Sequence, residues 1–295
     1  MMKGTPTIDD AVTLWSSWEA AEEVLRKCDG CTGKNILDIR DGLPRLDACR
    51  KPRIETDGTV SWHTCPVQES FRQKTLCQRL LGEARIPSRF TRRTLETFEP
   101  RDKDSKLALK IAREFISEWG KPDMPGLLIV GKNGTGKTHL AVGIMQEIIK
   151  KGVAARFYSS VAFLELAKEG FKNDTTRQMI EALAAIPLLV LDDLGKEFIK
   201  RSSANVDITD TWANEMFYAL INARYEQDKP LIVTTNLLDT EIAARYGASV
   251  WSRLAEMCRV VILDGTDYRQ EVARRPSSNP SPKWKLKKSS MICAL

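Results

Sequence analysis

The sequence predicts an α/β protein with a parallel sheet between helices, preceded by a small helical, zinc-binding N-terminal domain. Residues 125–270 alternate short apolar runs with helical patterns, which is typical of a parallel sheet covered on both faces. One loop in this region is glycine-rich and fits a phosphate-binding pattern. Residues 28–81 hold five of the seven cysteines, which indicates a metal-stabilised module ahead of the sheet.

The composition is that of an ordinary soluble globular protein. The chain has 295 residues, enough for about two domains, and is 42% hydrophobic and 28% charged. No apolar run approaches the ~20 residues that span a bilayer, and Trp15 and Trp18 lie among acids where a signal peptide needs an apolar core. We therefore expect a cytoplasmic protein without a membrane partner. The net charge of +6 (45 basic minus 39 acidic residues) is compatible with nucleic acid.

Four regions follow one another along the chain. Residues 1–81 are predicted to form the N-terminal domain, 82–124 a basic connector with a helix, 125–272 the sheet domain, and 273–295 a disordered basic tail. Residues 1–27 have the apolar spacing of one amphipathic helix. Such a helix either packs into a core or binds a partner.

The cysteine-rich segment predicts a structural zinc site. Cys28-x-x-Cys31 has the spacing of a metal knuckle, and a tetrahedral site needs a second pair of ligands. A hairpin from Arg53 to Trp62, with a turn at Asp57-Gly58 and Arg53 opposite Trp62, would supply that pair. In a reduced compartment a metal site is favoured over disulfides. The predicted Zn²⁺ ligands are Cys28, Cys31, Cys49 and Cys65, with His63 as the rival and Cys77 buried in a helix.

The connector and the sheet domain follow. Five arginines crowd the start of the connector, and a helix is expected from about Asp104 to Gly120. The arginines are Arg85, Arg89, Arg92, Arg93 and Arg101. The predicted strands are Leu127–Val130, Ala155–Tyr158, Leu188–Leu191, Leu231–Thr235 and Val260–Leu263.

The sequence from Gly131 to Thr138 fits G-x-x-x-x-G-K-[ST], the P-loop, in the strand–loop–helix context that the motif needs. Glycines let backbone N–H groups wrap the phosphates of ATP, and the helix N-terminus adds positive potential. Lys137 is expected on the β- and γ-phosphates and Thr138 on Mg²⁺. The predicted nucleotide-binding residues are Gly131, Asn133, Gly134, Thr135, Gly136, Lys137, Thr138 and His139.

Further polar residues follow the other strands. Asp192 would hold Mg²⁺ through water, and Asp193 would orient or deprotonate the attacking water. Asn236 ends another strand and would contact the γ-phosphate or that water if its strand lies between the other two. Arg253, in a helical pattern, is predicted to reach the γ-phosphate of a neighbouring subunit, with Arg245 as its competitor. Arg269 follows the last strand and is either a solvated arginine after a turn or a sensor of nucleotide in its own subunit.

These features together resemble the AAA+ ATPases of the DnaC/DnaI helicase-loader family and its IstB relatives. The resemblance covers residues 82–270 and rests on Gly131–Thr138, Leu188–Gly195, Thr234–Asn236 and Asp267–Arg269 at family-like spacing. It implies a five-stranded parallel core, with Asn236 as sensor 1, Arg253 as the arginine finger and Arg269 as sensor 2. Asp193 stands where many AAA+ proteins have Glu, and its shorter carboxylate predicts slow hydrolysis that DNA or a partner stimulates.

The resemblance implies loading of a DnaB-type replicative helicase onto single-stranded DNA during replication initiation, with ATP-dependent self-association into a ring or spiral. In initiator-type AAA+ proteins the segment equivalent to residues 159–186 grips single-stranded DNA. Here it contains Lys168, Lys172 and Arg177 near Phe163 and Phe171, which also fits an ordinary solvated helix pair.

Three other functions remain open at this level. An IstB-like transposition ATPase would assemble on duplex DNA and recruit a transposase, and the zinc module favours a loader over it. A small-molecule P-loop kinase is disfavoured by Asn236 and Arg253. A degenerate ATPase acting only as an adaptor would keep its activity after Lys137→Ala.

Overall fold

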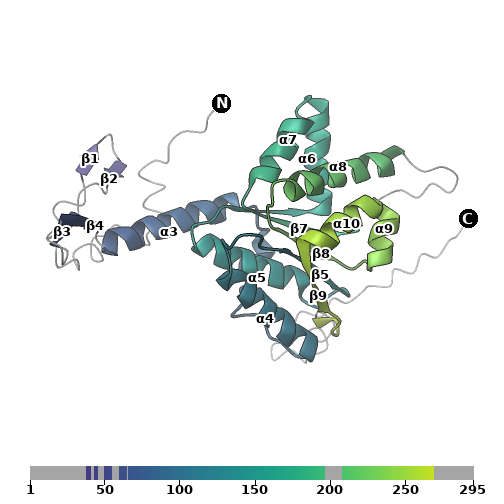
Figure 1. Ribbon diagram of the computed structural model, residues 1–295, viewed down its shortest axis with the longest axis horizontal. Helices are drawn as coiled ribbons and strands as arrows, with labels where there is room; N and C mark the ends of the chain where they lie inside the picture. Colours follow the sequence, from purple (N-terminus) through teal and green to yellow (C-terminus); the bar gives the residue numbers. More distant parts are fainter. Residues whose placement is uncertain are drawn as a thin grey trace, which may run out of the picture.

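The computed structural model describes residues 38–40, 43–45, 50–54, 60–64, 66–196 and 208–268, with side chains for 73–196 and 212–268. Among the described residues, five parallel strands form one sheet in the order β6-β7-β8-β5-β9 (Figure 1). The predicted parallel α/β sheet is therefore confirmed. The strands are β5 (Gly126–Gly131), β6 (Ala155–Ser159), β7 (Leu188–Leu194), β8 (Leu231–Thr235) and β9 (Cys258–Leu263).

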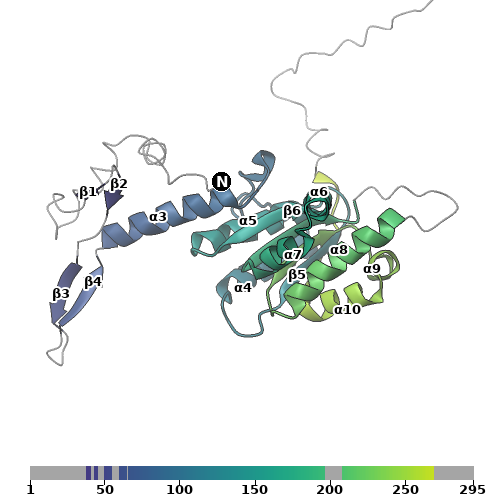
Figure 2. The same ribbon diagram turned by 90° about the horizontal axis from the view of Figure 1, so that it is seen from above.

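Helices cover both faces of the sheet, as Figures 1 and 2 show. One face carries α4 (Lys103–Ser117) and α5 (Lys137–Lys150). The opposite face carries α6 (Ser160–Lys172), α7 (Thr176–Ala185), α8 (Ile208–Tyr225), α9 (Asp239–Tyr246) and α10 (Ala248–Met257). No helix of the described part of the chain is both long and apolar enough to cross a membrane.

Strand residues alternate between the two cores. In β5, Leu127 and Ile129 pack with α4 and α5, whereas Leu128 packs with the helices of the opposite face. In β7, Val190 packs with α4 and α5, and Leu191 packs with the helices of the opposite face. The alternation follows from the two-residue repeat of a strand, and a strand buried on both faces is apolar throughout. This explains the continuous apolar runs of the sequence.

The strand order decides where polar groups meet. β8 lies between β5 and β7, so the carboxyl ends of these three strands are neighbours. This confirms the arrangement on which the prediction for Asn236 depended. Ligands of open α/β sheets bind at this edge, at the point where the strand order reverses.

The connector packs against the sheet domain and is not an extended linker. It includes η1 (Ser88–Phe90) and follows α3 (Pro66–Glu83), which runs across the predicted boundary at residue 81. The backbone N–H of Phe157 on edge strand β6 donates to Ala84 O at 2.9 Å. A Cβ at Gly143 of α5 would come within 3.0 Å of Leu95 N, so only glycine allows this approach. The connector therefore covers one edge of the sheet.

Two small hairpins lie beyond the far end of α3 (Figure 1). They are β1 (Asp38–Arg40) with β2 (Leu43–Arg45), and β3 (Arg50–Ile54) with β4 (Val60–Thr64). The predicted register of the second hairpin is wrong by one residue, because Arg53 lies opposite Ser61 and Pro52 opposite Trp62. Ile54 pairs with Val60, so five residues join the strands where a two-residue turn was expected.

The zinc prediction is not tested by the structure. Its four cysteine ligands lie outside the described residues, as do residues 1–27, Arg269 and the basic tail 273–295. The part of the chain that is described contains no cluster of three or more His, Cys, Asp or Glu side chains fit for a metal. Cys77 was expected to be buried, but it is half-buried on α3, with its thiol donating to Ile149 O at 3.4 Å.

Candidate nucleotide-binding site

The P-loop joins β5 to α5 through two glycines in the left-handed region. Gly134 has φ +78° and Gly136 φ +99°, values that L side chains rarely adopt. A Cβ at Gly134 would overlap the Asp267 carboxylate, and one at Gly136 would lie 3.0 Å from the Phe98 ring. The backbone angles therefore favour glycine at both positions, and the Phe98 ring leaves little space for a side chain at Gly136.

Lys137 occupies the centre of the loop. Its side chain is nearly buried, and its Nζ donates to Gly131 O at 2.7 Å and to Lys132 O at 2.6 Å. These carbonyls hold the ammonium inside the loop, where phosphate oxygens are better acceptors because they carry charge. The role of Lys137 on the phosphates stays a prediction.

Thr138 and Asp192 meet as predicted for a Mg²⁺ site. Thr138 Oγ1 donates to Asp192 Oδ1 at 2.9 Å, and Thr234 Oγ1 on β8 donates to the same oxygen at 2.6 Å. Asp192 is 4% exposed, and burial raises the pKa of its carboxyl, partly offset by the Thr234 hydrogen bond. Hydroxyl and carboxylate oxygens are the ligands that Mg²⁺ prefers, so this pair fits the ion.

Asp193 adopts a strained backbone next to Asp192. Its φ is +59°, and the pairing of β7 with β8 is irregular between Leu191 and Leu194. Thr234 Oγ1 accepts from the Asp193 N–H at 2.9 Å, and Ser160 Oγ donates to the Asp193 carbonyl at 2.9 Å. The bulge places Asp193 in the wall of a pocket that P-loop residues also line, whereas Asp192 is buried in the sheet.

Asn236 follows β8 directly and is exposed at the edge where the P-loop ends. It is not among the side chains that line the pocket. Thr235, just before it, is fully buried, and its hydroxyl donates to Leu194 O at 2.7 Å. The end of β8 is thus tied to the end of β7, and the assignment of Asn236 as a phosphate sensor stays a prediction.

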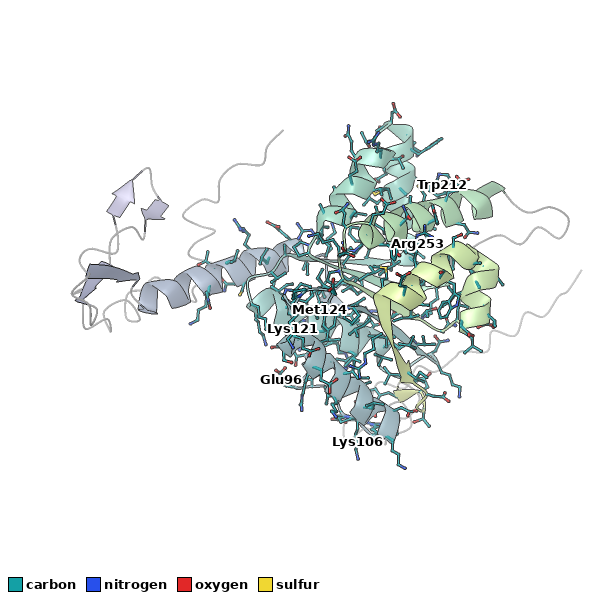
Figure 3. The ribbon with its side chains drawn as sticks, viewed as in Figure 1. Glu96, Lys106, Lys121, Met124, Trp212 and Arg253 are labelled. Atoms are coloured by element: carbon teal, nitrogen blue, oxygen red, sulfur yellow. The ribbon has the colours of Figure 1, made fainter. Side chains whose placement is uncertain are left out.

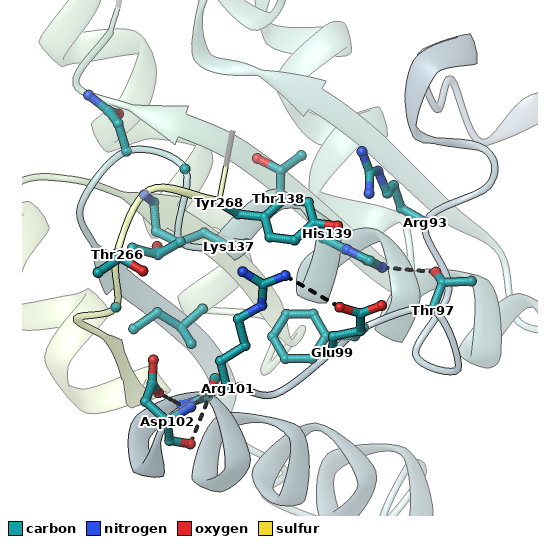
Figure 4. Close-up of a pocket in the computed structure, with 18 of the residues that line it drawn as sticks. Arg93, Thr97, Glu99, Arg101, Asp102, Lys137, Thr138, His139, Thr266 and Tyr268 are labelled. Atoms are coloured by element: carbon teal, nitrogen blue, oxygen red, sulfur yellow. Dashed lines mark hydrogen bonds and ion pairs between the residues drawn. The ribbon is translucent and has the colours of Figure 1, made fainter. Parts of the chain in front are cut away.

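The opposite wall of the pocket comes from the connector and from the segment after β9 (Figure 4). The Arg101 guanidinium lies 4.3 Å from the centre of the Tyr268 ring, and Tyr268 N donates to Gly134 O at 3.1 Å. Asp102 caps α4 through Ser105 N at 2.7 Å. Further lining residues are Phe90, Arg93, Thr97, Phe98, Glu99 and Thr266.

His139 attaches the connector to the first turn of α5. Its Nε2 lies 2.9 Å from Thr94 O and 3.1 Å from Thr97 Oγ1, and its ring meets Phe98 edge-on at 5.3 Å. Burial lowers the pKa of His139, which favours the neutral ring. His139 was predicted as a nucleotide ligand, and it lines the pocket while also fixing its wall.

Arg253 lies on α10 (Figure 3) and is not among the residues that line this pocket. Its Nε donates to Asn222 Oδ1 at 2.7 Å, and its guanidinium stacks 5.1 Å from the Tyr218 ring centre and 5.5 Å from that of Tyr225. These α8 residues hold the side chain in one orientation at the surface. Arg245, the competing candidate, ends α9 and lies against Tyr246.

The segment 159–186 forms the helix pair α6 and α7. Phe163 is fully buried, as an ordinary core residue would be, whereas Phe171 is 70% exposed. Lys168, Lys172 and Arg177 are exposed with it. The interpretation as core phenylalanines is therefore confirmed for Phe163 alone. Phe171 is a surface residue on the same helix as the exposed Lys168 and Lys172.

Sequence reasoning missed the wall that faces the P-loop. Arg93 and Arg101 stood out only as part of a basic stretch, Tyr268 only as part of the Asp267–Arg269 motif, and Phe98 carried no signal of a role in binding. No spacing rule connects residues 93–101 with residue 268, because the sheet brings them together. Lys196, which also lines the pocket, was overlooked for the same reason.

Comparison with known proteins agrees with this geometry. The model of the family of IstB-like ATP binding proteins matches residues 68–276. The replicative helicase loader DnaC of Escherichia coli is 23% identical over 81% of this chain and 98% of its own length. The replicative helicase loader DnaI of Bacillus subtilis is 20% identical over 84% and 80%. The B. subtilis protein YqaM is 28% identical, and the match spans 67% of this chain and 63% of that protein.

The crystal structure of a DnaC helicase loader superposes with a TM-score of 0.53 and 28% identity, over 60% of this chain and all of that chain. An insertion sequence IS21-like ATP-binding protein of Bacteroides fragilis is 27% identical over 52% of this chain and 56% of its own length.

Proposed function

The chain belongs to the family of IstB-like ATP binding proteins, and from that premise we propose that it loads a DnaB-type replicative helicase onto single-stranded DNA during replication initiation. The observation that carries the proposal is the match to DnaC, which spans 98% of that loader. ATP binding at the P-loop pocket would drive the cycle, and its slow hydrolysis would end it.

Nucleotide binding would use residues already in position. The Lys137 ammonium would exchange its two carbonyl acceptors for phosphate oxygens, and the loop N–H groups would donate to the same phosphates. Thr138 and Asp192 would hold Mg²⁺, which neutralises phosphate charge when bound. Thr234 keeps Asp192 oriented toward Thr138 by its 2.6 Å hydrogen bond.

Hydrolysis would rely on Asp193. Asp193 lines the same pocket as the P-loop lysine, and its carboxylate would accept a proton from the attacking water. Asn236, exposed at the end of the neighbouring strand, would orient that water or the terminal phosphate. Arg269, which follows Tyr268 at the pocket wall, is proposed to sense the bound nucleotide from the same subunit.

Self-association would complete the site. Arg253 does not line the pocket of its own chain, but it is presented at the surface by Asn222 and Tyr218. An arginine held in this way can stabilise transition-state charge in the site of a neighbouring subunit. We therefore propose a ring or spiral that assembles when ATP is bound.

Single-stranded DNA would contact the α6–α7 pair. Phe171 offers a ring on which a base can stack, and Lys168 and Lys172 offer charge for the phosphates. The N-terminal region, including the predicted zinc site, would hold the helicase. These two contacts would place the helicase and its DNA on one loader.

The test is co-elution from a sizing column with the replicative helicase of the host, with and without ATP. Wild-type protein should form a large complex, and Lys137→Ala should lose the ATP dependence of its assembly. Absence of a complex, together with ATP-dependent assembly on duplex DNA, would favour the second candidate, a transposition ATPase. That candidate is supported by the similarity to the IS21-like ATP-binding protein.

A further inference from the structure

Lys196 forms an ion pair with the residue proposed to activate water. Its Nζ lies 2.8 Å from Asp193 Oδ1, and the two side chains are 38% and 29% exposed. Both line the pocket that contains the P-loop. The pair is therefore open to the pocket, and one carboxylate oxygen of Asp193 is occupied by the ammonium.

A tight turn fixes this pairing. Lys196 N donates to Asp193 O at 3.1 Å, and Gly195 has φ +102°. A Cβ at Gly195 would lie 2.7 Å from Leu237 Cδ1, so the turn packs closely against the chain just after Asn236. Thr235 Oγ1 donates to Leu194 O and accepts from Leu237 N at 3.0 Å. The ends of β7 and β8 thus hold Lys196 beside Asp193.

We propose that Lys196 is a positioning residue that restrains hydrolysis by holding Asp193 away from the attacking water. The proposal rests on the function proposed above, in which Asp193 receives the water proton. In that step the water oxygen bonds to the terminal phosphorus as the bond from phosphorus to the bridging oxygen breaks. ADP leaves with that electron pair, and the proton of the water passes to the Asp193 carboxylate.

The ion pair opposes this step because the ammonium holds one of the two carboxylate oxygens, Oδ1, and so fixes the orientation of the Asp193 side chain. Release of the pair would free both oxygens of Asp193. A helicase, DNA or a neighbouring subunit that draws Lys196 away from Asp193 would raise the rate of ATP hydrolysis. Breaking the pair would therefore explain how such a partner stimulates hydrolysis. The expected rise in the rate of hydrolysis is modest, because a partly exposed ion pair is weak.

Lys196→Met tests the proposal, since methionine retains much of the apolar stem but carries no charge. We expect basal kcat for ATP to rise roughly two- to fivefold, with an unchanged Kd for a fluorescent ATP analogue. Lys196→Arg should keep the low rate. In an Asp193→Asn background the methionine substitution should have no effect on the residual rate, because the lysine acts through that carboxylate.

Lys121→Met is the matched control (Figure 3). It removes a lysine from an ion pair of the same three-residue spacing, Lys121 with Glu118 at 3.0 Å, just before β5 and so at the opposite end of that strand from the P-loop. It should leave kcat unchanged, and thermal melts should show all variants folded.

Two outcomes would overturn the proposal. A lower kcat with weaker ATP-analogue binding would make Lys196 a phosphate ligand, and an unchanged kcat would make the pair a surface contact only. Failure of the proposed function would appear separately, as a Lys137→Ala variant that binds and hydrolyses ATP as well as the wild type does.

Discussion

Arg224, the largest fully buried side chain among the described residues, supplies the sharpest stability prediction. It lies near the end of α8, and burial lowers its pKa to about 9, which leaves it cationic at neutral pH. Its two Nη atoms donate to five backbone carbonyls in place of a carboxylate. The acceptors are Leu183, Ala184, Ile186, Pro187 and Pro230, at 2.6–3.3 Å.

Arg224→Met removes these donors and leaves buried carbonyls unsatisfied. A hydrogen bond to a charged group contributes about 1.5–3 kcal/mol to stability. The contributions of five acceptors that share two nitrogens are not additive. Recovery of the desolvation cost of the cation offsets part of the loss. We expect the free energy of unfolding to fall by about 3–5 kcal/mol, a large share of the ~5–15 kcal/mol typical of a domain.

Urea unfolding followed by circular dichroism would measure this loss. Arg224→Lys keeps a charge but reaches fewer carbonyls, so it should lose an intermediate amount. Arg177→Met is the control, because Arg177 is 91% exposed and should change stability by less than about 0.5 kcal/mol. A loss of less than about 1 kcal/mol for Arg224→Met would refute the reasoning.

Three further predictions concern the nucleotide site. Asp192→Asn should abolish Mg²⁺-dependent ATP hydrolysis but raise the free energy of unfolding at pH 7, because burial raises the pKa of the Asp192 carboxyl and its ionisation therefore costs the folded state. The folded wild type binds a proton at Asp192 more readily than the unfolded chain does. In urea melts, the stability gained by Asp192→Asn over the wild type should therefore shrink as pH falls through the raised pKa of Asp192. A gain that does not change with pH would contradict this prediction. Gly136→Ala should weaken nucleotide binding and cost about 1–3 kcal/mol, given φ +99° and the Phe98 ring 3.0 Å away; equal melts and equal Kd for the ATP analogue would disprove it. Arg253→Ala and Lys137→Ala should each be inactive alone, whereas mixing them should restore measurable ATPase if the arginine acts across subunits, and no recovery would exclude that role.

The fold could be predicted because its signals are local. A P-loop needs its glycines, lysine and threonine within eight residues, and strands buried on both faces are apolar along their whole length. The irregular pairing of β7 had no such signal, so β7 was predicted to end at Leu191, whereas it continues through both aspartates to Leu194. The hairpin register failed because the Asp57-Gly58 turn signal suggested a two-residue turn, whereas five residues join the paired strands.

The sequence by itself determined the candidate residues of the nucleotide site, because the P-loop and the apolar strand that leads into Asp192 are short-range patterns. Only the tertiary structure decided what surrounds them. The wall of Phe98, Arg101 and Tyr268 and the pairing of Asp193 with Lys196 depend on how strands and loops pack. The physical reason is that periodicity records which face of an element is buried, whereas it does not record which distant side chain fills the space beside it.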